Sequence, residues 1–496
     1  MYFTSENILL IGSVLIFFSI LISKAGYKFG LPSLLLFLVA GMLFGSDGLG
    51  LQFNSMDHAQ FIGMVALCVI LFTGGMETTI KEIRPVLGEG LALSTIGVLL
   101  TTVFTGAFIY LLSVWNMAPI SLPVVTCFLL AATMSSTDSA SVFNILRNSK
   151  MKLKNNLQPL LELESGSNDP MAYILTIVLI QVANSVSGLG ASGDVGAQVQ
   201  AWPVILDAVK TLFLQFGVGI VFGVIMGYFG VWVLNKIKLN NTPLYAILLL
   251  SVVFFSFTVT TKLYGNGYLA VYLAGVIIGN HKITGRKEIF TFFDGMTWLM
   301  QVTMFVALGL LVNPHEMMKS APIALLIGLF MMFIGRPLSV FMTLAPFKKV
   351  SLKSKTYISW VGLKGAAPII FATYPVIAEV EGSSEIFNIV FFITLLSLVV
   401  QGTTISASAR KLHLSLPVPE DENTFGVEVQ EEAGKLVEMT LTEEMLSRGN
   451  TLKDVKLPKG MLVMFVKRGE KFIVPDGSVE LHVGDRLLII SENESD

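Results

Sequence analysis

The chain has 496 residues, of which 53% are hydrophobic and only 14% are charged. A soluble protein of this length carries about 25% charged residues, so the composition excludes a soluble enzyme and indicates a membrane protein with several spans. The net charge of −2 hides an asymmetry, because from His413 onward nine basic residues stand against seventeen acidic ones. We therefore predict a faintly basic membrane unit followed by an acidic soluble tail.

Thirteen apolar stretches come close to the length of about 20 residues that a membrane-spanning helix needs. They lie near 7–23, 31–49, 58–76, 88–114, 121–146, 157–183, 205–234, 243–262, 268–280, 293–313, 320–345, 356–378 and 386–409. No basic region or small-residue cleavage pattern precedes the first stretch, so it is predicted to be a transmembrane helix and not a signal peptide.

Basic residues in the short loops predict the orientation of these spans. Nineteen Lys and Arg residues fall in one set of alternate loops, and only Lys210, Lys262 and Lys319 fall in the other set. Basic loops stay in the cytoplasm. We therefore expect a multi-pass protein of the cell inner (plasma) membrane, with its N-terminus outside and its tail in the cytoplasm.

The fifth stretch ends in a hydroxyl-rich run, residues 131–141, that contains Thr137 and Asp138. Consecutive hydroxyl side chains compete for backbone hydrogen bonds and weaken an apolar helix. We predict a helix break that carries the Asp138 carboxylate. The alternative is a hydroxyl-rich packing face with Asp138 at the membrane boundary.

The sixth stretch carries Glu164, Ser165, Asn168 and Asp169. On a helix, Ser165 and Asp169 share one face, and Asp169 lies about 18 Å from the cytoplasmic end, near the middle of the bilayer. Ionisable groups at that depth are costly and usually mark an ion pathway. Carboxylate, hydroxyl and carbonyl oxygens suit an alkali cation, although Asp169 could instead be a structural acid paired with a base. Glu164 is interpreted as a charge partner more than as a ligand.

Two basic residues also lie at depth, Arg336 in the eleventh stretch and Lys364 in the twelfth. Buried cations need partners, so we expect Arg336 to neutralise Glu164 and Lys364 to offset the partial charges of broken half-helices. Gly362, Gly365 and Pro368 make the twelfth stretch easy to unwind. If stretches 1–6 and 8–13 are two halves, the breaks in the fifth and twelfth correspond, which is typical of a transporter with a repeat-interface site.

At these residues the chain resembles the bacterial monovalent cation:proton antiporter-1 family. The resemblance covers the membrane part and rests on Thr137-Asp138, the Glu164 to Asp169 motif, Arg336 and residues 362–365. It implies thirteen helices in an all-α inverted-repeat fold with two discontinuous crossing helices, a homodimer and alternating access. It also implies that cation and proton share Asp169, with Thr137, Asp138, Ser165 and Asn168 completing the site. Two departures are Thr73, where many sodium-exchanging members have an acid, and Lys364, where many have Arg.

The tail, from about Gly434, has a β-like pattern with strands near 463–466, 472–474 and 487–490. It resembles the C-terminal ligand-binding (TrkA-C type) domain of potassium-conductance regulators, which implies regulation by a cytoplasmic ligand, with cyclic di-AMP as a candidate. The alternative is a dimerising domain without a ligand. We thus predict a membrane exchanger domain over 1–411, a linker over 412–433 and a small cytoplasmic α+β regulatory domain over 434–496.

The leading hypothesis is a potassium:proton antiporter, with Asp169 occupied by either the cation or the proton. The alternatives are a sodium:proton antiporter, a ligand-gated potassium efflux channel, and a symporter of organic anions. The chain is predicted not to be an enzyme and to need no cofactor. It has no Walker loop, so ATP is not expected to drive the cycle, and its five histidines do not cluster, so no metal site is expected. The expected partners are potassium or sodium ions, protons and membrane lipids, but no nucleic acid.

Overall fold

The computed structural model spans the whole chain and divides it into two compact units, Met1–Pro417 and Val418–Asp496. It describes residues 5–27, 32–115, 122–191, 201–417, 435–441, 445–446, 449–453, 461–469 and 471–491. The acidic run Glu420 to Glu422 of the predicted linker lies outside these residues, as do residues 192–200.

The helices of the first unit follow the thirteen predicted stretches. In its described part, eight helices are long and apolar enough to cross a membrane, and five shorter apolar helices accompany them. The helical segments of the first half, some of which follow one another within a single span, are α1 (Ser5–Tyr27), α2 (Ser33–Phe44), α3 (Met56–Glu77), α4 (Ile80–Ile83), η1 (Arg84–Val86), α5 (Leu87–Ala92), η2 (Leu93–Gly97), α6 (Val98–Val114), α7 (Val124–Thr133), α8 (Ser139–Asn148) and α9 (Leu157–Ala191).

The second half contains α10 (Ala201–Lys236), α11 (Pro243–Lys262), α12 (Gly267–Gly279), α13 (Arg286–Leu311), α14 (Pro314–Phe330), η3 (Met331–Gly335), α15 (Arg336–Thr343), α16 (Leu352–Trp360), α17 (Ala366–Ile377) and α18 (Ser383–Lys411). Two short strands, β1 (Met151–Leu153) and β2 (Ser415–Pro417), pair antiparallel and join the end of this unit to the α8–α9 connection.

Irregular turns occur at matching places in the two halves. The fourth and eleventh stretches each contain one π-helical turn, η2 and η3. The fifth and twelfth are each broken, between α7 and α8 and between α16 and α17. Such paired interruptions are what two related halves produce, and π-turns inside helices are frequent at functional sites. The predicted fold class is therefore confirmed.

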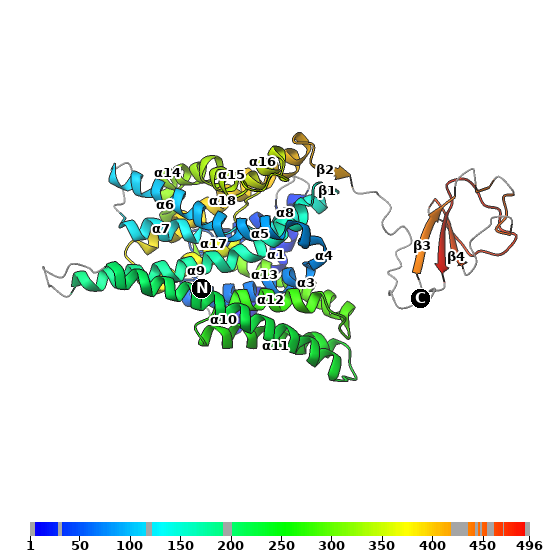
Figure 1. The fold of residues 1–496 in the computed structure, drawn as a ribbon, viewed down its shortest axis with the longest axis horizontal. Coiled ribbons are helices and arrows are strands. Elements are labelled where there is room, and N and C mark those ends of the chain that lie inside the picture. The colour runs from blue at the N-terminus through cyan, green and yellow to red at the C-terminus, as the bar shows by residue number, and fades with distance from the viewer. Residues whose placement is uncertain are drawn as a thin grey trace. The chain divides into compact units, whose positions relative to one another are not determined.

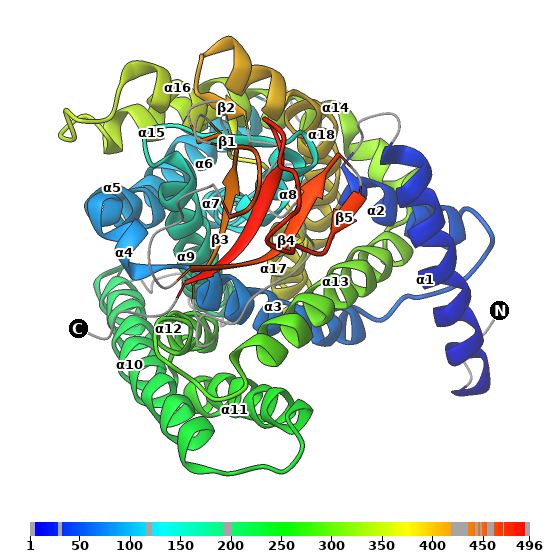
Figure 2. The same ribbon diagram turned by 90° about the vertical axis from the view of Figure 1, so that its right-hand side faces the viewer.

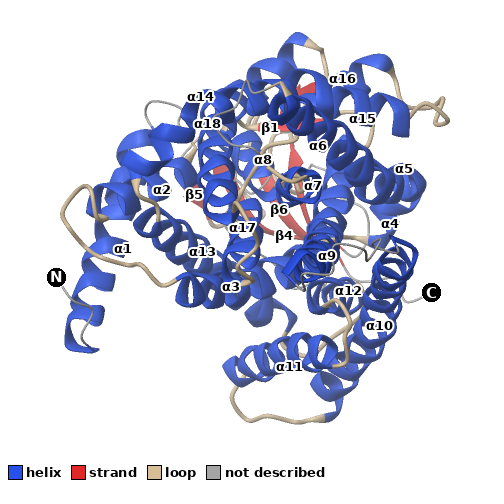
Figure 3. Ribbon diagram, turned by 90° about the vertical axis from the view of Figure 1, so that its left-hand side faces the viewer, coloured by secondary structure: helices blue, strands red, loops and turns tan. Residues whose placement is uncertain are grey.

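The helices of the first unit form two groups. α1–α3 and α10–α13, the scaffold group, pack mainly against one another, and α4–α9 with α14–α18 form the core group. Figures 1 and 2 show α10, α11 and α12 along one side and α14, α15 and α16 along the other. The groups meet where α17 packs on α3 and α9 packs on α10 and α12. Figure 3 shows α3, α9 and α17 in the middle of the unit.

Three glycines of α10, the seventh predicted stretch, allow close packing within the membrane unit. Gly219, Gly223 and Gly227 of α10 all face α12, and a Cβ at Gly223 would lie 2.8 Å from the Cα of Ala270. Small residues at four-residue spacing let two helices approach closely in a membrane. Of the two roles that this spacing allows, internal packing and dimer contact, the fold shows the first.

The second unit contains one antiparallel sheet of the described strands, in the order β3-β6-β4-β5. These strands are β3 (Lys435–Thr440), β4 (Met461–Arg468), β5 (Lys471–Ile473) and β6 (Arg486–Ser491). Val463, Val466, Leu487 and Ile489 belong to its buried apolar core. The described residues of this unit form strands and turns, so the helical part of the predicted α+β domain stays a prediction.

Candidate functional site

The α9 helix holds the break between α7 and α8 through two side chains. The Ser165 hydroxyl donates to the Thr137 carbonyl oxygen over 2.8 Å and accepts from the backbone N–H of Ser139 over 3.0 Å. One turn along, Asn168 Nδ2 donates to Thr137 Oγ1 over 2.6 Å. The unwound backbone thus finds partners in α9 side chains, which is how irregular backbone is tolerated inside a membrane protein.

Asp138 caps the second half of this broken helix. Its carboxylate accepts from the backbone N–H of Ser141 over 3.0 Å and also from the Ser141 hydroxyl. Its own backbone N–H donates to the Leu363 carbonyl oxygen over 2.8 Å, so the two broken helices are joined at their breaks. A Cβ at Gly365 would collide with the Asp138 side chain. Only a glycine lets the two breaks cross this closely.

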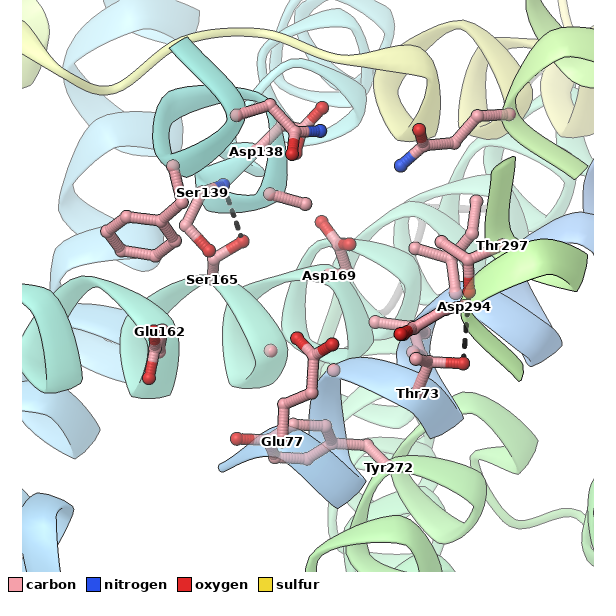
Figure 4. A pocket seen from close by; sticks show the side chains of 18 of the residues that line it. Thr73, Glu77, Asp138, Ser139, Glu162, Ser165, Asp169, Tyr272, Asp294 and Thr297 are labelled. Carbon is pink, nitrogen blue, oxygen red and sulfur yellow. Dashed lines mark hydrogen bonds between the residues drawn. The ribbon is translucent and has the colours of Figure 1, made fainter. Parts of the chain in front are cut away.

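Asp169 carries the carboxylate oxygen of the predicted site that the protein leaves without a hydrogen bond among the described residues. This oxygen, Oδ1, is buried. Figure 4 shows Asp169 pointing from α9 towards the break that carries Asp138 and Ser139, with Thr73 and Thr297 nearby. A buried carboxylate oxygen without a partner is costly unless a proton or a cation neutralises it.

A cavity of about 240 Å³ leads to this carboxylate. Asp138, Ser165 and Asp169 line it, and so do Thr73 and Gln301 of the scaffold group. A smaller cavity of about 40 Å³, lined by Asp138, Asp169 and Gln301, lies against the start of α17. The two carboxylates therefore face both cavities.

Three acidic residues of the larger cavity were not predicted as site residues. Glu77 ends α3, Glu162 lies in the first turns of α9, and Asp294 lies on α13; Arg147 accompanies them. They stand near the helix ends that carry the basic loops. The signal in the sequence was an acidic residue at the same end of the third, sixth and tenth stretches, but only the fold shows that these ends share one cavity.

The two basic residues at depth lie behind the carboxylates. Arg336 Nη2 and Glu164 Oε1 form a salt bridge whose side chains are 3% and 1% exposed. Lys364 Nζ donates to the Ser136 carbonyl oxygen over 2.8 Å, within the first break, and its backbone N–H donates to Ser397 Oγ over 2.9 Å. Arg336 thus contacts Glu164, and Lys364 contacts the first of the two breaks.

Residues 13–411 match the family described as "Sodium/hydrogen exchanger, transmembrane", which spans nearly the whole first unit. This chain belongs to that family. Its members are transporters, so the chain is a transporter and not an enzyme. Residues 436–495 match the TrkA-C domain, which agrees with the resemblance of the tail.

Several relatives of this exchanger are curated antiporters. It is 35% identical over 493 residues to the K(+)/H(+) antiporter NhaP2 of Shewanella sp. (strain MR-4), covering 99% of this chain and 82% of the relative. It is 35% identical over 490 residues to the K(+)/H(+) antiporter NhaP of Alkalimonas amylolytica, with 98% and 81% covered. Identity is 26% over 334 residues to the Na(+)/H(+) antiporter NhaH of Halobacillus aidingensis, covering 66% of this chain and 76% of the relative.

A solved structure shares the fold of this exchanger. The sodium proton antiporter MjNhaP1 of Methanocaldococcus jannaschii, determined at pH 8, aligns with a TM-score of 0.67 at 23% identity. The alignment covers 82% of this chain and 99% of that one. It supports the architecture of the membrane unit.

Proposed function

We propose that this chain exchanges a monovalent cation, potassium, for protons. The observation that carries the proposal is the buried Oδ1 of Asp169, which finds no hydrogen-bond partner in the described part of the chain and lies at a cavity that Asp138 and Ser165 also line. Either a proton or a desolvated cation satisfies this oxygen, and the two compete for it. Potassium is favoured because the relatives that match the chain at 35% identity are named K(+)/H(+) antiporters.

The charges around the crossing agree with a single monovalent occupant. When all are ionised, the three acids and two bases around the crossing of the broken helices carry one net negative charge. These residues are Asp138, Glu164, Asp169, Arg336 and Lys364. One proton or one alkali cation neutralises this set. A net charge in a medium of low dielectric constant opposes movement across the membrane, so the site crosses only when one of the two is bound.

The exchange cycle follows from the two helix groups. Asp138 and Asp169 belong to the core group, whereas Thr73 and Gln301 belong to the scaffold group on the other side of the cavity. Movement of the core group against the scaffold group exposes the carboxylates alternately to the two sides, as in other transporters with repeated halves. Thr137, Ser165 and Asn168 keep the break in shape during this movement.

The remaining parts of the proposal concern assembly and control. The basic loops favour an N-terminus outside and a tail in the cytoplasm of the cell inner membrane. The TrkA-C domain, placed at 434–496 after a linker over 412–433, regulates the exchanger domain over 1–411, with cyclic di-AMP as a candidate ligand. The active form is a homodimer.

The test is proton flux in proteoliposomes on addition of potassium, sodium or lithium. Asp169→Asn should reduce cation-dependent flux to the level of empty liposomes, since it removes the titrating group. Asp207→Asn, on the exposed part of α10, is the matched control and should retain flux. Full exchange by Asp169→Asn rules out the proposed site, and potassium flux without proton movement indicates a channel.

A further inference from the structure

Gln301 carries one of the buried polar atoms that lack a hydrogen bond within the described part of the membrane unit. It lies on α13, its side chain is 5% exposed, and its Oε1 has no hydrogen-bond partner among the described residues. Leaving a buried amide group unsatisfied costs about 1–3 kcal/mol. A buried group kept at that cost needs an explanation, and a bound ion supplies one where the group also lines a cavity.

Gln301 also lies where a ligand would reach it. It lines both the larger and the smaller cavity, and Asp138 and Asp169 are the other two residues that do so with polar side chains. The carboxylates come from the core group and Gln301 comes from the scaffold group. The three side chains therefore approach the same space from opposite sides.

Two threonines lie beside Gln301 on the side of the cavity that the scaffold group forms. Thr297 precedes Gln301 by four residues on α13, so the two side chains share a helix face. Thr297 Oγ1 donates to Thr73 Oγ1 over 3.0 Å, and Thr73 Oγ1 donates to the Val69 carbonyl oxygen over 2.9 Å. Because the Thr297 hydroxyl donates its proton to Thr73, the lone pairs of the Thr297 oxygen stay available to a cation.

We propose that Gln301 is a cation ligand that determines specificity, because it supplies a neutral amide oxygen opposite Asp169. The oxygen and nitrogen of a glutamine amide are told apart only by their hydrogen-bond partners. Because Oε1 of Gln301 has no such partner among the described residues, the amide can rotate without breaking a hydrogen bond of this oxygen. Selectivity among alkali cations depends on the number and the field strength of the oxygen ligands. Neutral amide and hydroxyl oxygens have a weaker field than carboxylates, so they favour potassium over the smaller sodium and lithium ions.

This inference rests on the proposed function, and it gives the scaffold group a part in the exchange. The cation loses its amide ligand when the core group moves away from α13, whereas a proton on Asp169 needs no such ligand. Gln301 should therefore affect the apparent affinity for the cation more than the maximal rate.

The test compares Gln301→Leu and Gln301→Glu with Gln215→Leu. Gln215, on α10, is 7% exposed and its Oε1 also lacks a partner among the described residues, but it lines neither cavity, which makes it a matched control. Proton flux in proteoliposomes gives the KM for potassium, rubidium, sodium and lithium. The shift in melting temperature with each cation, in choline chloride of equal ionic strength, reports binding without transport.

Losing one ligand interaction should raise the KM for potassium by about tenfold in Gln301→Leu, with a smaller change for sodium and lithium. Gln301→Glu, which is nearly the same size, should shift the preference towards sodium and lithium by about tenfold or more. A potassium-to-sodium KM ratio within about twofold of wild type in both variants, or an equal change in Gln215→Leu, overturns the inference.

The two readouts separate this inference from the proposed function. If wild type shows cation-dependent melting shifts but no proton flux, exchange is disproved, and the melting shifts of the Gln301 variants still decide the role of the amide. If wild type exchanges normally and the variants keep its ion preference, only the proposed role of Gln301 as a ligand is disproved.

Discussion

At the scale of single residues, Glu164 and Arg336 form an ion pair that is shielded from solvent. Both side chains are almost fully buried, and Arg336 Nε and Nη1 have no hydrogen-bond partner among the described residues. A buried ion pair gives little net stability, but removal of one partner leaves an isolated buried charge. The pair therefore acts as a unit behind the carboxylates of the site.

This asymmetry gives a prediction on stability. Glu164→Leu or Arg336→Leu alone should lower the free energy of unfolding by about 3–5 kcal/mol, and the double variant should lose less than either. Thermal unfolding in detergent measures the order of the three variants. The control is Lys319→Ala, which breaks an exposed pair with Glu316 and should cost less than about 1 kcal/mol. A double variant less stable than both single ones would contradict the account.

At the scale of elements, the two broken helices cross because their breaks share a hydrogen bond. The backbone N–H of Asp138 donates to the Leu363 carbonyl oxygen over 2.8 Å, and Gly365 lies directly against the Asp138 side chain. Lys364 Nζ reaches the Ser136 carbonyl oxygen in the opposite break over 2.8 Å. The crossing is thus one structure built from two stretches that are more than 200 residues apart.

Gly365→Ala tests how closely the breaks must approach. The new methyl group meets the Asp138 carboxylate, so we expect overpacking of about 1–3 kcal/mol and a displaced carboxylate. Misplacement at a site of this kind reduces turnover by about 100-fold. Proton flux and thermal unfolding measure the two effects.

The control for this substitution is Gly217→Ala on α10, where a Cβ meets nothing within 4 Å. It should leave flux unchanged and stabilise the helix by up to about 1 kcal/mol. Equal flux in both glycine variants would mean that the crossing tolerates a wider separation than the structure indicates.

At the scale of the whole molecule, the chain consists of two units with separate cores. Residues up to Pro417 belong to the first unit, because β2 pairs with β1 and the Leu414 carbonyl oxygen accepts from the Lys154 backbone N–H over 2.9 Å. The linker predicted to begin at 412 therefore starts with residues that pair with the membrane unit. The second unit is small, and units of this size are only marginally stable.

The second unit should have its own response to acid. The Asp485 carboxylate is 3% exposed and accepts from Arg468 Nη2 over 2.7 Å and from the His482 backbone N–H over 2.9 Å. Burial acts to raise the pKa of Asp485, but the hydrogen bonds from Arg468 and His482 outweigh it and hold the pKa below the ordinary value of 3.8. A lowered pKa in the folded state gives stability that is present above pH 3.8 and lost as the pH falls through the lowered value.

Pepsin cleavage of the full-length protein tests this response. Cleavage within residues 435–491 should accelerate as the pH falls below about 4, before the membrane unit is cut. Asp485→Asn should raise cleavage already at pH 5 and flatten the pH dependence. Asp476→Asn is the control: Asp476 is exposed and accepts from Ser478 within its own turn, so this substitution should change the acid response less than Asp485→Asn does. An acid response that is unchanged in Asp485→Asn would disprove the role of this pair.

The sequence by itself determined the class of protein, the thirteen helices and the two breaks. Apolar length, hydroxyl runs and glycine or proline positions act on the nearest residues, so they are readable without the fold. The same holds for the carboxylates at depth, Asp138, Glu164 and Asp169, because a charge in an apolar stretch is visible in one dimension.

Only the tertiary structure decided what faces these carboxylates. Glu77, Asp294, Thr297 and Gln301 come from helices of the scaffold group, and no spacing in the chain relates them to Asp169. Gln301 in particular reads as one polar residue in an apolar helix until its position on both cavities is known. The physical reason is that the packing of α3 and α13 against α9 and α17 sets these distances, and packing depends on side chains far apart in the sequence.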